Sequence, residues 1–451
     1  MAIHSTGNPA HAVQAGDPRA IIAQSPMRLR QLLAIATCVA LNALDGFDVL
    51  SISFASPGIS AEWGIDRAAL GIVLSMELIG MAAGSVLLGP LADRVGRRPT
   101  ALVCLLIMAL GMAATAHVHA IWQLAAFRLA TGIGIGGMLA CTNAMVAEYA
   151  NDRWRGAAVA VMAAGYPMGA IAGGAFATSL LVDGSWRDIF TFGAIASAAL
   201  IPFLLVLTPE SVGYLLQRER RDGTLAKVNR ALAGLGHGPV DRLPEPLVHA
   251  KAKTSFHRLF AGDLRRTTLL LAAAYFCHVM TFYFILKWVP KIVVDMGYAA
   301  SAAGGVLVYA NVGGLLGALL LSALTLRIPL RSIMIGTMVL STAMVVWFGQ
   351  GHADLVSLAF AAAAAGFFTN AGMVGFYALI ASSFPTAARG GGTGFVIGVG
   401  RGGAALGPVV AGFLFEGGMG LSGVAVAMGL GSLVAAAAIL GLPSKAVSVE
   451  D

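Results

Sequence analysis

The stretch Asn42-Ala43-Leu44-Asp45-Gly46-Phe47-Asp48 places two carboxylates in the middle of an apolar run over residues 31–56. A run of this length can cross a bilayer as a helix. Each carboxylate there costs ~2.5–3.5 kcal/mol of insertion free energy. Asp45 and Asp48 are three residues apart, so they share one helix face with Asn42 and Ser51. We predict that this polar face lines a wet cavity or contacts a polar partner helix.

The composition indicates a membrane protein. Of the 451 residues, 58% are hydrophobic and 11% are charged, whereas soluble domains have about 25% charged residues. The 57 glycines suit close packing of helices in a membrane. The four cysteines lie in apolar runs without a CxxC pair, so we expect inert thiols and neither a disulfide nor a metal site.

Apolar segments recur in two groups of six, separated by a polar stretch. We predict an all-α membrane protein with twelve transmembrane helices in two six-helix bundles. The predicted divisions are a mobile N-terminal tail over 1–30, a first bundle over 31–208, a central loop over 209–266, a second bundle over 267–441 and a C-terminal tail over 442–451.

The basic residues predict the orientation. Placing both termini in the cytoplasm puts eleven Lys or Arg of the central loop, from Arg218 to Arg266, on the cytoplasmic side, together with Lys445 near the C-terminus. The opposite side then holds only Arg67, Arg187 and Lys291. This asymmetry is typical of the positive-inside rule. The net charge of +7 therefore points to a membrane rather than to nucleic acid as a partner.

The two halves resemble each other in sequence. An offset of 234 superposes three positions of the fifth and eleventh segments: Arg155 on Arg389, Gly169 on Gly403 and Gly173 on Gly407. Setting Pro57 on Pro290 aligns the first and seventh segments and places His278 on Asp45. Repeated six-helix halves predict a substrate site near the midplane between them.

A second motif, Gly89-Pro90-Leu91-Ala92-Asp93-Arg94-Val95-Gly96-Arg97-Arg98, falls between the second and third segments. It resembles the signature loop of the major facilitator superfamily. The resemblance implies that fold and a gating charge network at the interface of the halves. The implied members of the network are Asp93, Arg94, Arg97, Arg98 and Glu148. The corresponding loop of the second half, residues 322–327, carries no acid, so a symmetric second network is not expected.

The opening stretch, followed by Ser56-Pro57, resembles the first helix of the aromatic acid/proton symporters, and the resemblance covers essentially the whole chain. It implies proton-coupled import of a hydroxybenzoate-like acid across the bacterial inner membrane by alternating access. Protons would be the coupling ion, without a cofactor, and we expect a monomer. Two close carboxylates at low dielectric do not both ionise easily, so we expect Asp45 and Asp48 to couple to the proton as a unit. The alternative is permanent pairing with an arginine.

Arg401 is our candidate clamp for the substrate carboxylate, because guanidinium binds that group in a bidentate manner; pairing with an acid is its alternative role. Arg128 either pairs with Asp45 or Asp48, contacts substrate, or extends outward to the membrane surface. Further candidate substrate contacts, each with a packing alternative, are Asn143, Tyr166, Asn370 and Tyr377.

Three more residues are secondary candidates. Glu77 joins helices or belongs to the proton path, and His278 relays protons or is a hydrogen-bonded structural residue. Arg389 is expected to anchor a loop at the cytoplasmic mouth. Alternative functions are a symporter for muconate or another dicarboxylate, a drug/proton antiporter, and a non-transporting sensor. An enzyme is not expected, because the sequence contains no nucleophile–base set or metal cluster.

Overall fold

The computed structural model describes residues 17–217, 223–244, 259–352 and 354–443. Within these ranges the regular structure is helical, without strands, and twelve helices are long and apolar enough to span a membrane. The prediction of an all-α membrane protein with twelve spanning helices is confirmed. Arg218, Lys445 and much of the predicted tails lie outside the described residues.

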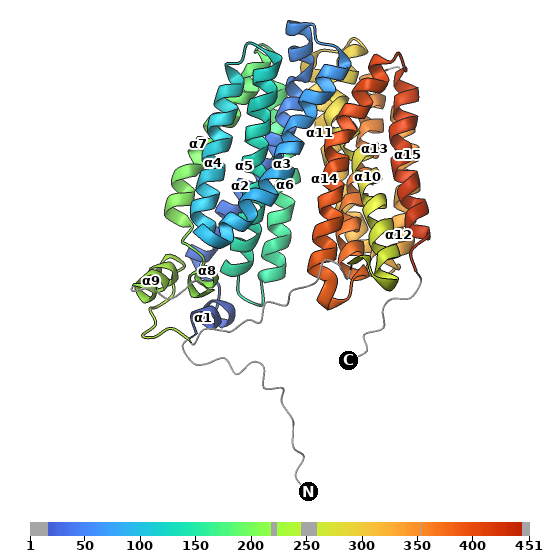
Figure 1. Cartoon of the computed structure of the whole chain (residues 1–451). Helices are drawn as coiled ribbons and strands as arrows, with labels where there is room; N and C mark the ends of the chain where they lie inside the picture. Colours follow the sequence, from blue (N-terminus) through green and yellow to red (C-terminus); the bar gives the residue numbers. More distant parts are fainter. Residues whose placement is uncertain (1–16, 218–222, 245–258, 353, 444–451) are drawn as a thin grey trace.

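The first half contains six long helices (Figure 1). They are α2 (Leu29–Trp63), α3 (Arg67–Val95), α4 (Arg97–Ala116), α5 (Ile121–Tyr149), α6 (Arg155–Leu180) and α7 (Trp186–Leu207). Local chemistry sets several boundaries. Gly64 adopts φ 59° and ends α2, and the Asp66 carboxylate then accepts from the Ala69 amide at 2.6 Å and caps α3.

The second half repeats this arrangement. Its helices are α10 (Gly262–Asp295), α11 (Ala300–Leu324), α12 (Leu330–Phe348), α13 (Leu355–Ser383), α14 (Thr386–Glu416) and α15 (Leu421–Leu440). We call the end of the bundles at which α2 begins and α15 ends the terminal end, and the opposite end the distal end.

Three short helices lie at the terminal end (Figure 1): α1 (Pro18–Gln24), α8 (Val212–Gln217) and α9 (Thr224–Gly234). The described part of the predicted tail over 1–30 packs against the first half. Ile22 of α1 is buried, and the Ala23 carbonyl accepts from the Asp152 amide at 2.9 Å. Burial of an apolar side chain and one backbone hydrogen bond attach α1 to the first half.

Packing inside each half reproduces the sequence repeat. Gly169 of α6 lies against the backbone of Ala43 in α2, and Gly403 of α14 lies against the backbone of Phe276 in α10. The partners Ala43 and Phe276 are 233 residues apart, the same offset that sets Pro57 on Pro290. Both alignments of the halves therefore match equivalent helix contacts.

The halves contact each other through α3 and α14, α6 and α11, and α10 and α2. The contacts gather toward the distal end. Arg67 pairs with Asp295 at 3.0 Å, and Gly71 lies against the backbone of Pro408. At the same end Gly304 of α11 lies against Thr178 of α6. This arrangement closes the distal end of the interface between the halves.

Candidate functional site

A buried charge cluster joins the two halves. Glu77 of α3, Arg128 of α5 and Lys287 of α10 all have fully buried side chains. The Glu77 carboxylate forms an ion pair with Arg128 and lies 3.5 Å from the Lys287 ammonium. Lys287 also donates to the backbone carbonyl of Val49 in α2. One acid thus faces two cations, and one of these comes from the other half.

Glycines explain how α3 and α5 approach so closely. A Cβ on Gly132 would overlap the Glu77 carbonyl, and one on Gly80 would overlap that of Leu129. Small residues at these positions let the backbones touch. The close approach brings the Arg128 and Glu77 side chains together in a space that also holds the ring of Phe190, 5.4 Å from the Arg128 guanidinium.

Arg128 has a partner that was not among its predicted ones, and its contact with substrate stays a prediction. Its side chain is completely buried, so extension to the membrane surface is wrong. Its ion pair is with Glu77 and not with either aspartate carboxylate; toward Asp48 it donates only to the backbone carbonyl, at 2.9 Å. Nothing in the sequence spacing could show this, because the partner is chosen by packing between helices far apart in the chain.

Asp45 and Asp48 are both fully buried, and within the described ranges none of their four carboxylate oxygens has a hydrogen-bond partner. The same holds for the amide oxygen of Asn42, whose nitrogen donates to the Met162 carbonyl at 2.6 Å. An ionised carboxylate in such a place is strongly destabilising unless a nearby cation balances its charge. The pair is therefore suited to a role in which its charge changes.

A second group of polar side chains surrounds Arg401 of α14. This half-buried guanidinium forms no ion pair with any described residue, and the ring of Tyr275 lies against the neighbouring Gly400. Tyr275 and Tyr377 have ring centroids 6.2 Å apart and interact through their hydroxyls. Tyr166, from the first half, interacts with the Tyr283 hydroxyl. Aromatic faces and hydroxyls thus surround one arginine without a carboxylate partner.

The two candidate amides have protein partners. Asn370 donates to the Gly314 carbonyl of α11 at 2.8 Å, and the exposed Asn143 donates to Leu139 of its own helix at 2.8 Å. A substrate contact through either amide stays a prediction. Arg389 is exposed, and its suggested loop-anchoring role also stays a prediction.

His278 matches its structural alternative. The ring is fully buried, with Nε2 2.9 Å from the Thr369 carbonyl and Nδ1 2.9 Å from the Ser432 hydroxyl. A carbonyl can only accept, so Nε2 carries the proton and Nδ1 accepts from Ser432. Both nitrogens of the neutral ring are satisfied, which favours a structural histidine over a proton relay.

The predicted gating residues meet at the terminal end of the first half. Arg97 pairs with Asp93 at 3.1 Å and lies 3.8 Å from Glu148. Arg94 is exposed, and Arg98 donates to the carbonyl of Leu205. All of these contacts lie within the first half in this structure, where the distal end holds the halves together.

Glu210, which is not among the predicted site residues, completes this network. Its carboxylate accepts from the backbone amides of Arg97 at 3.0 Å and Ser211 at 2.8 Å, and it fills the space beside Gly96, which has φ 125°. Burial raises the pKa of the Glu210 carboxyl. In the sequence, Glu210 stands two residues after the end of the predicted first bundle.

Comparisons with known proteins agree with this architecture. The family profile described as Major Facilitator Superfamily matches residues 38–359 and 271–450. A gallate transporter of Pseudomonas putida is 30% identical over 92% of this chain and 92% of its own. The 4-hydroxybenzoate transporter PcaK of Pseudomonas aeruginosa is 30% identical over 96% of this chain and 98% of its own. The inward-open structure of the xylose transporter XylE from E. coli superposes with a TM-score of 0.71 at 16% identity, covering 93% of this chain and 98% of that one.

Proposed function

Because this chain belongs to the Major Facilitator Superfamily, we propose that it is a proton-coupled transporter that imports a hydroxybenzoate-like aromatic acid by alternating access. Similarity to proteins named as gallate and 4-hydroxybenzoate transporters supports the substrate class. The observation that carries the proposal is Arg401, a guanidinium without a carboxylate partner in the described structure, among Tyr275, Tyr283 and Tyr377. Arg401 clamps the substrate carboxylate, and the tyrosines contact its ring and hydroxyl groups.

Charge balance supports a role for Asp45 and Asp48 in proton coupling. Arg128 and Lys287 bring two buried positive charges, and Glu77 brings one negative charge. One ionised aspartate balances the cluster, and the other aspartate is then free to hold a proton. Each further buried excess charge is costly, so the pair exchanges no more than one proton, and it does so as a unit. Glu77 holds the two cations in place for this exchange.

Lys287 links proton binding to movement of the halves. It reaches from α10 to the carbonyl of Val49, the residue after Asp48, and to the Glu77 carboxylate. A change of charge on Asp48 therefore alters the field at a contact between the halves. This contact would be made in the state that is closed at the distal end and broken in the opposite state.

The positive-inside pattern supports an orientation with the terminal end in the cytoplasm, in a bacterial inner membrane. Arg94, Arg97 and Arg98 then lie inside, and the Arg67–Asp295 pair lies outside. In this orientation the closed distal end faces the outside.

Uptake of labelled 4-hydroxybenzoate by the reconstituted full chain tests the proposal. We expect accumulation driven by an imposed pH gradient and abolished by a protonophore. Arg401→Gln should lose uptake, whereas Arg327→Gln, at an exposed arginine in the same half, should keep it. Uptake indifferent to the protonophore would exclude proton coupling, and normal uptake by Arg401→Gln would exclude the clamp.

A further inference from the structure

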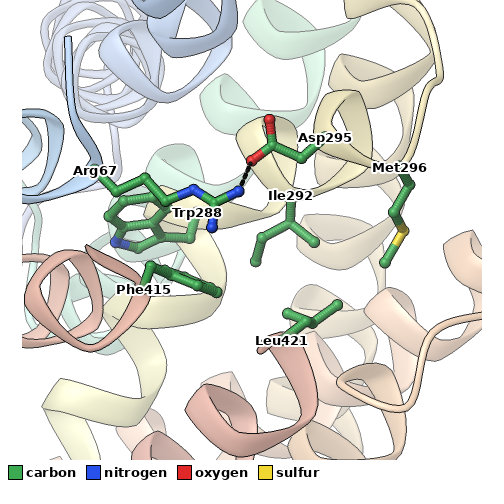
Figure 2. A pocket seen from close by; sticks show the side chains of 7 residues that line it. All are labelled: Arg67, Trp288, Ile292, Asp295, Met296, Phe415 and Leu421. Carbon is green, nitrogen blue, oxygen red and sulfur yellow. Dashed lines mark hydrogen bonds and ion pairs between the residues drawn. The ribbon is translucent and has the colours of Figure 1, made fainter. Parts of the chain in front are cut away.

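A pocket lies at the distal end, and neither Arg401 nor any member of the buried charge cluster lines it. It encloses about 180 Å³ between α3, α10, α14 and α15 (Figure 2). Its apolar walls come from Trp288, Ile292, Met296, Phe415 and Leu421. Two charged side chains, Arg67 and Asp295, form its rim.

The apolar part has the size and chemistry for one aromatic ring. An apolar cavity of about 150 Å³ is sufficient to bind benzene, and this pocket encloses about 180 Å³. Trp288 and Phe415, with ring centroids 5.1 Å apart, offer aromatic surface for offset or edge contacts with a further ring. The pocket is therefore large enough for a benzoate-sized ring.

The rim supplies a cation for a carboxylate. The Arg67 guanidinium lies 5.3 Å above the Phe415 ring and pairs with Asp295 at 3.0 Å (Figure 2). Asp295 has a second cation, Lys291, one turn earlier on α10. An incoming carboxylate can take the place of Asp295 at Arg67, because Asp295 keeps Lys291. The exchange costs little free energy, since both Arg67 and Asp295 are partly exposed and exposed ion pairs contribute little to stability.

The exchange also affects contact between the halves. Arg67 begins α3 of the first half, whereas every other lining residue belongs to the second half. Besides Asp295, Arg67 is held by Glu416, which accepts from its backbone amide at 3.2 Å. Replacing Asp295 by a free carboxylate removes one side-chain link that holds the distal end closed.

We propose that this pocket is a second binding site, for an aromatic monocarboxylate, in which the anion displaces Asp295 from Arg67 and loosens the closed distal end. The proposal rests on the proposed function for its substrate class. The site is separate from Arg401 and would receive the acid before the halves reopen.

Ligand-detected NMR with benzoate, on the full chain in lipid nanodiscs, tests the site. Arg401→Gln serves as the background, so that the central site does not contribute. We expect saturable binding in this background, and binding at least about tenfold weaker after addition of Arg67→Gln, because hydrogen bonds to a charged group are lost. Acetate and benzyl alcohol, which lack the ring or the charge, should not displace benzoate.

Arg187→Gln is the matched control. Arg187 is also a distal-end arginine, stacked on Trp186 at 4.2 Å and paired with Glu62, but all three residues belong to the first half. Its substitution should leave benzoate binding unchanged. Asp295→Asn should instead strengthen binding, because it removes the competing carboxylate. If the Arg67–Asp295 ion pair were only structural, Arg67→Gln and Asp295→Asn would change benzoate binding in the same direction.

The proposal is overturned if Arg401→Gln binds no benzoate, or if the Arg67 and Asp295 variants change binding in the same direction. Uptake by the wild-type chain is measured separately. Normal uptake without this second binding rejects only the pocket. Binding that depends on Arg67 in a chain without aromatic acid uptake rejects the proposed function and leaves the pocket in place.

Discussion

Lys287, from the second half, holds its ammonium 3.5 Å from the carboxylate of Glu77 in the first half. The two side chains meet in a fully buried environment, where Glu77 also pairs with Arg128. Each member of this cluster depends on the others, because an unpaired charge in such a place is costly. Substitutions in this cluster should therefore affect both protein stability and transport.

Glu77→Gln should destabilise the protein strongly. The substitution leaves the buried Arg128 and Lys287 without their carboxylate, and breaking a buried ion pair in this way costs ~3–5 kcal/mol. The measurement is the apparent melting temperature of the purified full chain. Glu62→Gln, which breaks the partly exposed pair with Arg187, is the control and should cost less than about 1 kcal/mol. Equal shifts for the two variants would contradict the buried cluster.

Adding Lys287→Met to Glu77→Gln should restore part of the lost stability. The double substitution removes one uncompensated cation and keeps a side chain of similar length, so its effect is less than additive. Transport should stay impaired, because the link between α10 and α2 is gone. Lys227→Met, at an exposed lysine of α9, should restore nothing in the same background.

Asp45→Asn and Asp48→Asn should abolish the coupling of transport to protons with little loss of protein stability. Neither carboxylate accepts a described hydrogen bond, and in each single variant the remaining aspartate can still balance the cluster, so each single variant should melt within ~1 kcal/mol of the wild type. We expect loss of uphill, proton-driven uptake, while exchange of labelled against unlabelled acid across the membrane continues. Full pH-driven accumulation in the double variant would show that the proton binds elsewhere.

Gly169→Ala should impair folding and transport. The added methyl overlaps the backbone of Ala43 in α2, and forcing extra volume into a packed interface costs ~1–3 kcal/mol. Gly156→Ala on the same helix is the control, because its Cβ meets nothing within 4 Å. The measurements are the melting temperature and the membrane expression level of each variant. Similar values for Gly169→Ala and Gly156→Ala would refute the close contact between α2 and α6.

Glu210→Gln should change how stability depends on pH. Burial raises the pKa of Glu210, so the folded state binds its proton more tightly than the unfolded state. The stabilisation from this group is full below the ordinary glutamate pKa and is lost as the pH rises through the raised value. The difference in melting temperature between wild type and variant should therefore change over the pH range between the ordinary glutamate pKa and the raised pKa of Glu210. A constant difference would contradict the assignment.

The spanning helices could be predicted from sequence because long apolar runs have few alternatives in a membrane. The repeat was also visible, since Gly169 and Gly403 are required at equivalent backbone contacts. The partner of Arg128 was not, because Glu77 and Asp48 are both acids at reachable depth and only the packing of α3 on α5 selects between them. Lys287 could be recognised in the sequence as a charge within a spanning segment. Its partners could not be predicted, because they lie in the other half.

The offset of 233 residues gives Lys287 a counterpart in the first half, Phe54. Phe54 also crosses to the opposite half, where its ring lies against Gly304 of α11. Equivalent positions thus form two crossing contacts, one purely apolar and one charged. An apolar contact is insensitive to protonation, so a proton can act on only one side of the pseudo-symmetric interface. In the proposed mechanism, the Phe54 contact is therefore a passive pivot, and the Lys287 contact is the one that responds to a change of charge.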